Sequence, residues 1–202
     1  MASLYFIYGT MSSSKSMRLL AVNHNYIENG MKTLLLTSAL DNRDGVGIVS
    51  SRAGLTSEAT AIDETDNLFA LFSSIDDSVD AILVDESQFL TRTQVLELSK
   101  IVDNYNIPVM CYGLKTDFQG VLFKGSEALL EIADKLEEVK TLCRFCDKKA
   151  IMNMRVDENG RKLLEGETVQ IGGNESYLPV CRKHFFGPPN GSVSGGSNAE
   201  SK

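Results

Sequence analysis

Hydrophobic residues in the first 140 positions gather in short runs that alternate with longer segments of helical spacing. The runs predict five strands, at 3–8, 33–37, 81–85, 108–112 and 137–141. The segments 33–37 and 81–84 are continuously apolar, as in strands buried on both faces of a parallel sheet. The spacing predicts helices at 15–29, 91–104 and 126–136, and Thr91 with Gln94 forms a capping-box pattern at the second. This alternation predicts an α/β domain with a mostly parallel sheet flanked by helices.

The remaining segments differ in character from this alternation. The polar stretch at about 38–64 is long enough to predict a functional or mobile loop. From about 142 the chain has short turns, glycine pairs and charges, and from Gly187 it is rich in Gly, Ser, Asn and Pro. We therefore divide the chain into an α/β domain at 1–140, a small domain at 141–186 and a disordered tail at 187–202.

Composition and charge exclude several classes of partner. The 202 residues are 43% hydrophobic and carry a formal net charge of -7, without a strong basic cluster. A basic surface for duplex nucleic acid or for a membrane is therefore not expected. Apolar runs stay well short of the roughly 20 residues of a membrane span, and no cationic segment precedes the apolar N-terminus. These features predict a soluble, cytoplasmic protein.

The segment between the first predicted strand and helix resembles a phosphate-binding P-loop, G-x-x-x-x-G-K-[ST]. Gly9, Lys15 and Ser16 match the fixed positions, but Ser14 occupies the position of the second glycine. In such a loop the backbone N–H groups cradle phosphate oxygens, the lysine pairs with the outer phosphates, and the hydroxyl holds Mg²⁺. On its own, the segment is equally compatible with an ordinary turn and helix cap.

Two residue pairs in the small domain have the spacing of metal ligands. Cys143 and Cys146 form one pair, Cys181 and His184 the other, with 34 residues between the pairs. Three thiolates and one imidazole favour a closed, structural Zn²⁺ site, against a redox Cys-x-x-Cys or coincidental thiols. The fourth cysteine, Cys111, lies in an apolar run and is expected to be a core thiol.

Acidic residues follow the buried run 81–84. Asp85 and Glu86 suit the orientation of Mg²⁺ and proton acceptance from an attacking hydroxyl, although carboxylates are also common at exposed strand ends. Asp41 and Arg43 can serve phosphates in the same way, or form a solvated ion pair. Aromatic and apolar side chains after the strand 108–112 can line a pocket for a flat ring, or belong to the core: Tyr112, Leu114, Phe118 and Phe123.

Together these motifs resemble the cellular-type (type II) thymidine kinases, over about residues 2–186. The matching segments follow the family's order, at 8–11, 41–43, 51–55, 85–90, 112–118, 122–126 and 170–177, together with the two cysteine and histidine pairs. The similarity is greatest to bacterial and phage members. It implies a P-loop (RecA-like) α/β fold with a mostly parallel sheet, and a small zinc-binding domain that carries the substrate lid.

The resemblance implies transfer of the γ-phosphate of ATP to the 5′-hydroxyl of thymidine, with Mg²⁺ and a structural Zn²⁺. Glu86 would be the general base, and Ser16 and Asp85 would hold Mg²⁺. The implied contacts of ATP and its phosphates are Gly9, Thr10, Met11, Ser12, Ser13, Ser14, Lys15, Ser16, Arg43, Asp85, Glu86, Ser87 and Gln88. The implied nucleoside contacts are Met11, Phe89, Leu114, Phe118, Phe123, Thr168, Val169, Gln170, Ile171, Gly172 and Tyr177. Family members usually form homotetramers that thymidine triphosphate inhibits, and the resemblance implies both properties here.

Ser14 is the main departure from the family pattern. A side chain there can crowd the phosphates or strain a backbone that suits glycine, which predicts an active enzyme with weakened nucleotide binding. If φ at this position is negative, serine fits and its hydroxyl adds a phosphate contact.

Three other functions fit parts of the pattern. They are another P-loop phosphotransferase or ATPase with a zinc finger, a zinc-stabilised binding module with a decayed phosphate loop, and a nucleic-acid-binding zinc finger. Decay is disfavoured because Lys15, Ser16, Asp85 and Glu86 are all retained. The nucleic-acid reading ranks last, because acidic residues nearly balance the basic ones in the zinc segment.

Overall fold

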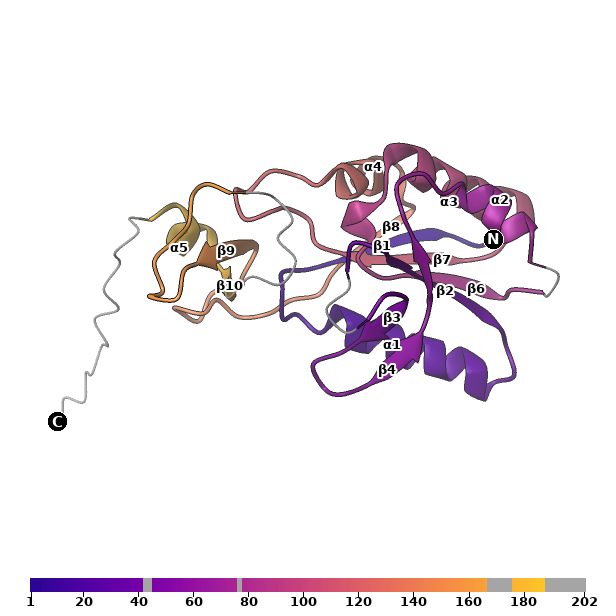
Figure 1. The fold of residues 1–202 in the computed structure, drawn as a ribbon, viewed down its shortest axis with the longest axis horizontal. Helices are drawn as coiled ribbons and strands as arrows, with labels where there is room; N and C mark the ends of the chain where they lie inside the picture. The colour runs from indigo at the N-terminus through magenta and orange to yellow at the C-terminus, as the bar shows by residue number, and fades with distance from the viewer. Residues whose placement is uncertain (42–44, 76–77, 167–175, 188–202) are drawn as a thin grey trace.

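The computed structural model describes residues 1–41, 45–75, 78–166 and 176–187 (Figure 1). Six strands form one parallel sheet in the order β5-β2-β6-β7-β1-β8. Their bounds are β1 Leu4–Tyr8, β2 Thr33–Ser38, β5 Thr60–Ile62, β6 Ala81–Val84, β7 Val109–Gly113 and β8 Lys135–Glu138. The α/β fold with a mostly parallel sheet is therefore confirmed.

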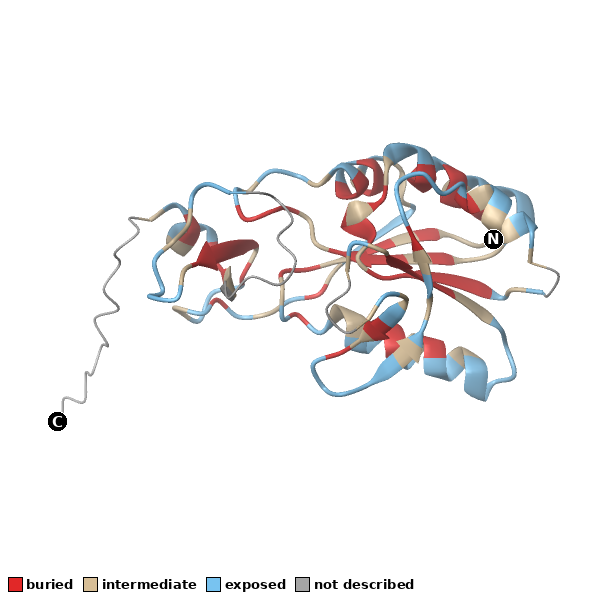
Figure 2. Ribbon diagram, in the orientation of Figure 1, coloured by how far each residue is buried: buried red, intermediate tan, exposed pale blue. Residues whose placement is uncertain are grey.

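Helices cover both faces of this sheet. One face carries α1 (Lys15–Glu28), and the other carries α2 (Leu68–Ser73), α3 (Arg92–Tyr105) and α4 (Lys124–Ile132) (Figure 1). Because neighbouring strand residues point to opposite faces, Phe6 packs in the cluster beneath α3 and Ile7 in the cluster beneath α1. Figure 2 shows that the buried residues concentrate on the sheet strands and on the inward sides of the helices. Among the described residues, the search for a helix with the length and apolar character of a membrane span finds none.

The predicted elements hold best where the chain is buried. The strands at 33–37 and 81–85 correspond to β2 and β6, and the Thr91–Gln94 capping box is present at the start of α3. The predicted helix 126–136 lies earlier in the chain, as α4 at Lys124–Ile132. The predicted strand 137–141 also lies earlier, as the edge strand β8 at Lys135–Glu138. The helix-forming residues of β8 take strand geometry because they pair with β1 along the sheet edge.

The stretch 38–64 contains more regular structure than the expected loop. Its described residues form a short antiparallel hairpin, β3 (Ile48–Ser50) with β4 (Thr56–Glu58), and the sheet strand β5. The hairpin lies beside α1 (Figure 1).

Residues 141–166 and 176–187 form a separate lobe, called the C-terminal lobe below. It contains the antiparallel strands β9 (Met152–Val156) and β10 (Ser176–Val180) and the short helix α5 (Arg182–Phe186). Its apolar cluster is small and includes two of the predicted metal ligands, Cys143 and Cys181. Apart from Gly187, the predicted disordered tail 187–202 lies outside the described residues.

Candidate active site

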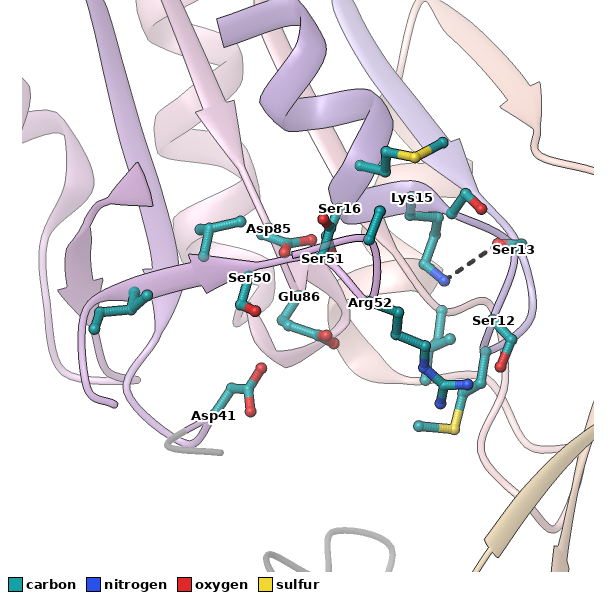
Figure 3. Close-up of a pocket in the computed structure, with 17 residues that line it drawn as sticks. Ser12, Ser13, Lys15, Ser16, Asp41, Ser50, Ser51, Arg52, Asp85 and Glu86 are labelled. Carbon is teal, nitrogen blue, oxygen red and sulfur yellow. Dashed lines mark hydrogen bonds between the residues drawn. The ribbon is translucent and has the colours of Figure 1, made fainter. Parts of the chain in front are cut away.

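A cavity of about 620 Å³ lies at the carboxyl edge of the sheet (Figure 3). The phosphate loop (residues 9–16) supplies Met11 to Ser16, and the end of β6 supplies Asp85 and Glu86. The hairpin segment adds Arg52, a cation that sequence reasoning did not assign to the site. In parallel α/β sheets, ligands bind outside the carboxyl ends of the strands, so this position suits a nucleotide.

The phosphate loop contains two serines in left-handed backbone conformation. Ser12 has φ 61° and Ser14 has φ 65°, whereas a side chain costs roughly 1–3 kcal/mol in such a conformation. The alternative of a negative φ at Ser14 is therefore wrong. Gly9 is needed for a different reason: a Cβ there would lie 2.7 Å from the carbonyl oxygen of Val139. Ser14 thus occupies a backbone position that favours glycine.

Lys15 begins α1 and folds back over the loop. Its Nζ donates hydrogen bonds to the Thr10 carbonyl oxygen at 2.9 Å and to Ser13 Oγ at 3.5 Å. Ser13 and Thr10 are buried, so the loop beneath the lysine excludes water. Lys15 lines the cavity, so its ammonium group can meet an anionic ligand there.

Asp85 follows β6 and is 5% exposed. Burial, followed by the charge of Glu86, raises the pKa of Asp85 to about 7, against the hydrogen bond from the Ser16 hydroxyl and the charge of Lys15. A hydroxyl and a buried carboxylate thus meet beside a cation. Both are oxygen ligands of the kind that Mg²⁺ prefers.

A buried glutamine holds the Glu86 side chain. Gln88 Nε2 donates to Glu86 Oε2 at 2.5 Å, and Gln88 Oε1 accepts from the Leu114 N–H at 3.0 Å. Ser87 and Gln88 are both buried and do not line the cavity, so direct contact of either with ATP stays a prediction. Gly113 makes this arrangement possible, since a Cβ there would lie 2.6 Å from Ser87 Oγ.

The predicted nucleoside contacts occupy several places around Glu86. Met11 and Leu114 line the main cavity, while Phe89 lines a second cavity of about 390 Å³ that shares Asp85 and Glu86. Phe89 contacts Phe123 edge to face, at 5.8 Å between ring centroids.

Other aromatic residues lie away from both cavities. Phe118 is buried beneath Arg155, whose guanidinium lies 5.0 Å from the Phe118 ring centroid and 6.0 Å from that of Tyr177. Tyr112 belongs to the core, and burial raises its pKa to about 12. The core alternative therefore applies to Tyr112.

Several predicted contacts lie outside the described residues: Arg43, Thr168, Val169, Gln170, Ile171 and Gly172. Asp41, two residues before Arg43, lines the main cavity. Arg155 and Asn153 are buried polar residues that no sequence motif pointed to. Their alternation with methionines in β9 was the available signal, because it places them on one face of a strand.

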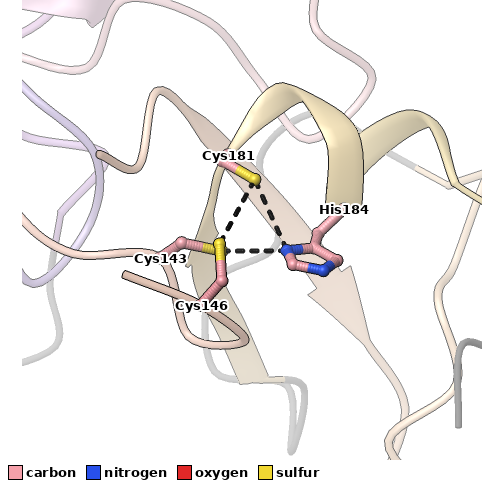
Figure 4. A group of neighbouring side chains, drawn as sticks. All are labelled: Cys143, Cys146, Cys181 and His184. Atoms are coloured by element: carbon pink, nitrogen blue, oxygen red, sulfur yellow. Dashed lines mark hydrogen bonds between the residues drawn. The ribbon is translucent and has the colours of Figure 1, made fainter. Parts of the chain in front are cut away.

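The four predicted metal ligands come together in the C-terminal lobe (Figure 4). Cys146 Sγ lies 3.8 Å from Cys181 Sγ, and His184 Nδ1 lies 3.3 Å from Cys143 Sγ and 3.4 Å from Cys181 Sγ. Tetrahedral zinc with Zn–S bonds of about 2.3 Å sets its sulfur ligands about 3.8 Å apart, so the residues present fit the ion. Burial keeps Cys111, which lies outside the cluster, as a core thiol with a raised pKa.

Comparison with known proteins identifies the family of this chain. Residues 2–185 match the family model described as thymidine kinase. A thymidine kinase of Streptococcus pyogenes serotype M3 is 51% identical over 188 residues, which are 93% of this chain and 99% of the relative. A thymidine kinase of Lactiplantibacillus plantarum is 53% identical over 189 residues, 94% of this chain and 98% of the relative. The resemblance inferred from the motifs is confirmed, and the chain belongs to the thymidine kinase family.

Proposed function

We propose that this protein transfers the γ-phosphate of ATP to the 5′-hydroxyl of thymidine, giving thymidine 5′-phosphate for DNA synthesis. The observation that carries the proposal is the meeting of Lys15, Ser16, Asp85 and Glu86 at one cavity, in a chain of the thymidine kinase family. Phosphoryl transfer depends mainly on positioning and on stabilising charge, and this set of groups supplies both.

The phosphate loop is the donor side of the proposed reaction. Its backbone N–H groups and Lys15 would bind the β- and γ-phosphates, with Arg52 and Arg43 as further cations. Ser16 and Asp85 would hold Mg²⁺, which when bound neutralises charge on the phosphates and favours ionised Asp85. The raised pKa of Asp85 supports this role, because burial and the charge of Glu86 disfavour its ionised form, and a bound cation would offset both.

Glu86 is the proposed general base on the acceptor side. Its carboxylate would take the proton of the 5′-hydroxyl, and Gln88 would fix its orientation through the hydrogen bond described above. Leu114, Phe89 and the segment 168–172 are proposed to surround the thymine ring. Closing that segment over the nucleoside would exclude water from the transfer.

Zinc, held by the four-ligand cluster, is proposed to stabilise the C-terminal lobe. All four ligand positions are protein side chains, so we assign the ion a structural role and no part in the reaction. We extend the proposal to a homotetramer inhibited by thymidine triphosphate. Light scattering in solution, and the assay below with added thymidine triphosphate, test these two points.

The proposal is tested by measuring ADP release with Mg-ATP and each of the four natural deoxynucleosides, with and without thymidine triphosphate. We expect release that depends on thymidine and that thymidine triphosphate reduces. Equal ADP release with and without any nucleoside would identify an ATPase instead. Thymidine binding without any ADP release would identify a binding module.

A further inference from the structure

Strand β9 of the C-terminal lobe has two faces with different partners. Met152, Met154 and Val156 pack in the apolar cluster that contains Cys143 and Cys181. The alternate residues, Asn153 and Arg155, point to the opposite face, and both are buried. Strand β9 therefore connects the cluster of metal ligands, on its apolar side, with the residues that contact Asn153 and Arg155 on its polar side.

Asn153 makes two hydrogen bonds beyond its own lobe. Its Oδ1 accepts from the backbone N–H of Met11 in the phosphate loop at 2.8 Å, and its Nδ2 donates to the Thr116 carbonyl oxygen, after β7, at 3.3 Å. Both ends of the amide are engaged and the residue is 3% exposed, so its orientation is fixed. In Figure 1 the segment after β1 runs toward the lobe, where this contact is made.

Met11 lies next to Ser12, which is in left-handed backbone conformation, and Ser14 follows in the same conformation. Non-glycine residues persist in such conformations only when surrounding structure restrains them. The Asn153 side chain is a restraint of this kind, supplied by a segment 142 residues away in the chain. A loop without it would relax toward conformations that no longer direct its N–H groups at a phosphate.

We infer that Asn153 is a positioning residue that holds the phosphate loop in its binding conformation from the metal-bound C-terminal lobe. The lobe thereby controls affinity for the phosphate donor as well as for the acceptor nucleoside. The inference deepens the proposed function and rests on it for the identity of the donor. The part of the inference that is independent of the proposed function is the hydrogen bond from the Met11 amide to Asn153.

Asn153→Ala tests this inference through two independent measurements. We expect the KM for ATP to rise about tenfold, because a buried N–H loses its partner, and the KM for thymidine to change less. We also expect hydrogen exchange at the Met11 amide to accelerate about tenfold, without loss of zinc. Asn153→Asp keeps the acceptor for Met11, although it removes the donor to Thr116 and adds a buried carboxyl group, so its Met11 exchange should lie nearer the wild-type rate. Asn159→Ala, in an exposed turn of the same lobe, is the matched control and should change neither value.

Zinc removal provides the second arm of the test. In the wild-type protein, chelation should accelerate Met11 exchange to the rate seen in Asn153→Ala, and chelation of that variant should add little further. Unchanged Met11 exchange and unchanged ATP affinity in a folded, zinc-containing Asn153→Ala protein would overturn the inference. If that variant does not fold, the inference is overturned by Met11 exchange that zinc removal leaves unchanged in the wild-type protein and in Asn153→Asp. If the wild-type protein shows no kinase activity, the exchange experiment still decides the inference, and only the proposed function fails.

Discussion

The six-stranded sheet and the C-terminal lobe are stabilised in different ways. The sheet is covered on each face by its own hydrophobic cluster, whereas the lobe has one cluster of seven buried residues, two of them predicted zinc ligands. We expect that a segment with so few apolar contacts does not fold by burial alone, and that metal binding at the four-ligand cluster supplies its folding free energy. The groups proposed for chemistry thus lie on the sheet, whereas Asn153, proposed to position the phosphate loop, lies on the lobe that we expect to depend on metal.

Replacing the proposed base breaks the chemistry while leaving both regions folded. We expect Glu86→Gln to lower kcat by about 10²–10⁴-fold, because a neutral amide cannot accept the hydroxyl proton. Binding of ATP and thymidine, measured by calorimetry, should stay close to wild type. Glu28→Gln, at the exposed end of α1, is the matched control for loss of one carboxylate. Near-normal turnover in Glu86→Gln would remove Glu86 as the base.

Loss of zinc should separate the two regions. We expect Cys146→Ser to lose the ion and to reduce kcat/KM for thymidine by about 100-fold, because zinc binding drives folding of such small segments. Hydrogen exchange should become fast in β9 and β10 and remain slow in β6 and β7. A lobe that stays protected from exchange without zinc would contradict the comparison.

Cys111→Ser in the sheet core should have the reverse effect, with faster exchange in β6 and β7 and no loss of zinc. That variant should lose about 1–3 kcal/mol of stability, since a hydroxyl is buried in an apolar cluster.

The same difference explains what the sequence could predict. Buried strands such as β2 and β6 have strong apolar runs, and the four candidate zinc ligands have a diagnostic spacing, so both were found. Strands β3, β4 and β5 are three residues each, too short for a period to register. The edge strand β8, with the sequence Lys-Leu-Glu-Glu, resembles a helix end until its pairing with β1 is known.

The roles of residues that act through backbone groups were the hardest to predict. Asn153, which no motif contained, accepts from the Met11 N–H, and Gln88, predicted only as an ATP contact, accepts from the Leu114 N–H. Such contacts leave no spacing pattern, because the partner is a backbone atom that every residue possesses. Motifs therefore located the reacting groups, whereas the residues that orient them required the tertiary structure.

Replacing Gln88 tests whether residues at the carboxyl edge of the sheet orient Glu86 without help from the C-terminal lobe. We expect Gln88→Leu to lower kcat about tenfold or somewhat more, since a hydrogen bond to a charged group contributes roughly 1.5–3 kcal/mol. The KM values for ATP and thymidine should change little, because the glutamine lies beneath Glu86 and outside the cavity. Gln119→Leu, which removes an exposed glutamine hydrogen bond, is the control. A raised KM for ATP with unchanged kcat would instead favour direct contact of Gln88 with the nucleotide.

Ser14→Gly has the smallest expected effect. It measures how much backbone strain the phosphate loop carries at the edge of the sheet. Glycine adopts φ 65° without the side-chain penalty, so we expect the KM for ATP to fall about threefold, a modest gain because glycine also makes the unbound loop more flexible. Asn106→Gly is the control, since Asn106 has φ 55° at the end of α3, outside the residues that line the cavity. Relief of strain there should leave the KM for ATP unchanged. Unchanged kcat and KM in Ser14→Gly would mean that the restraint from Asn153 already holds the loop in place, and that the serine side chain neither crowds the phosphates nor weakens their binding.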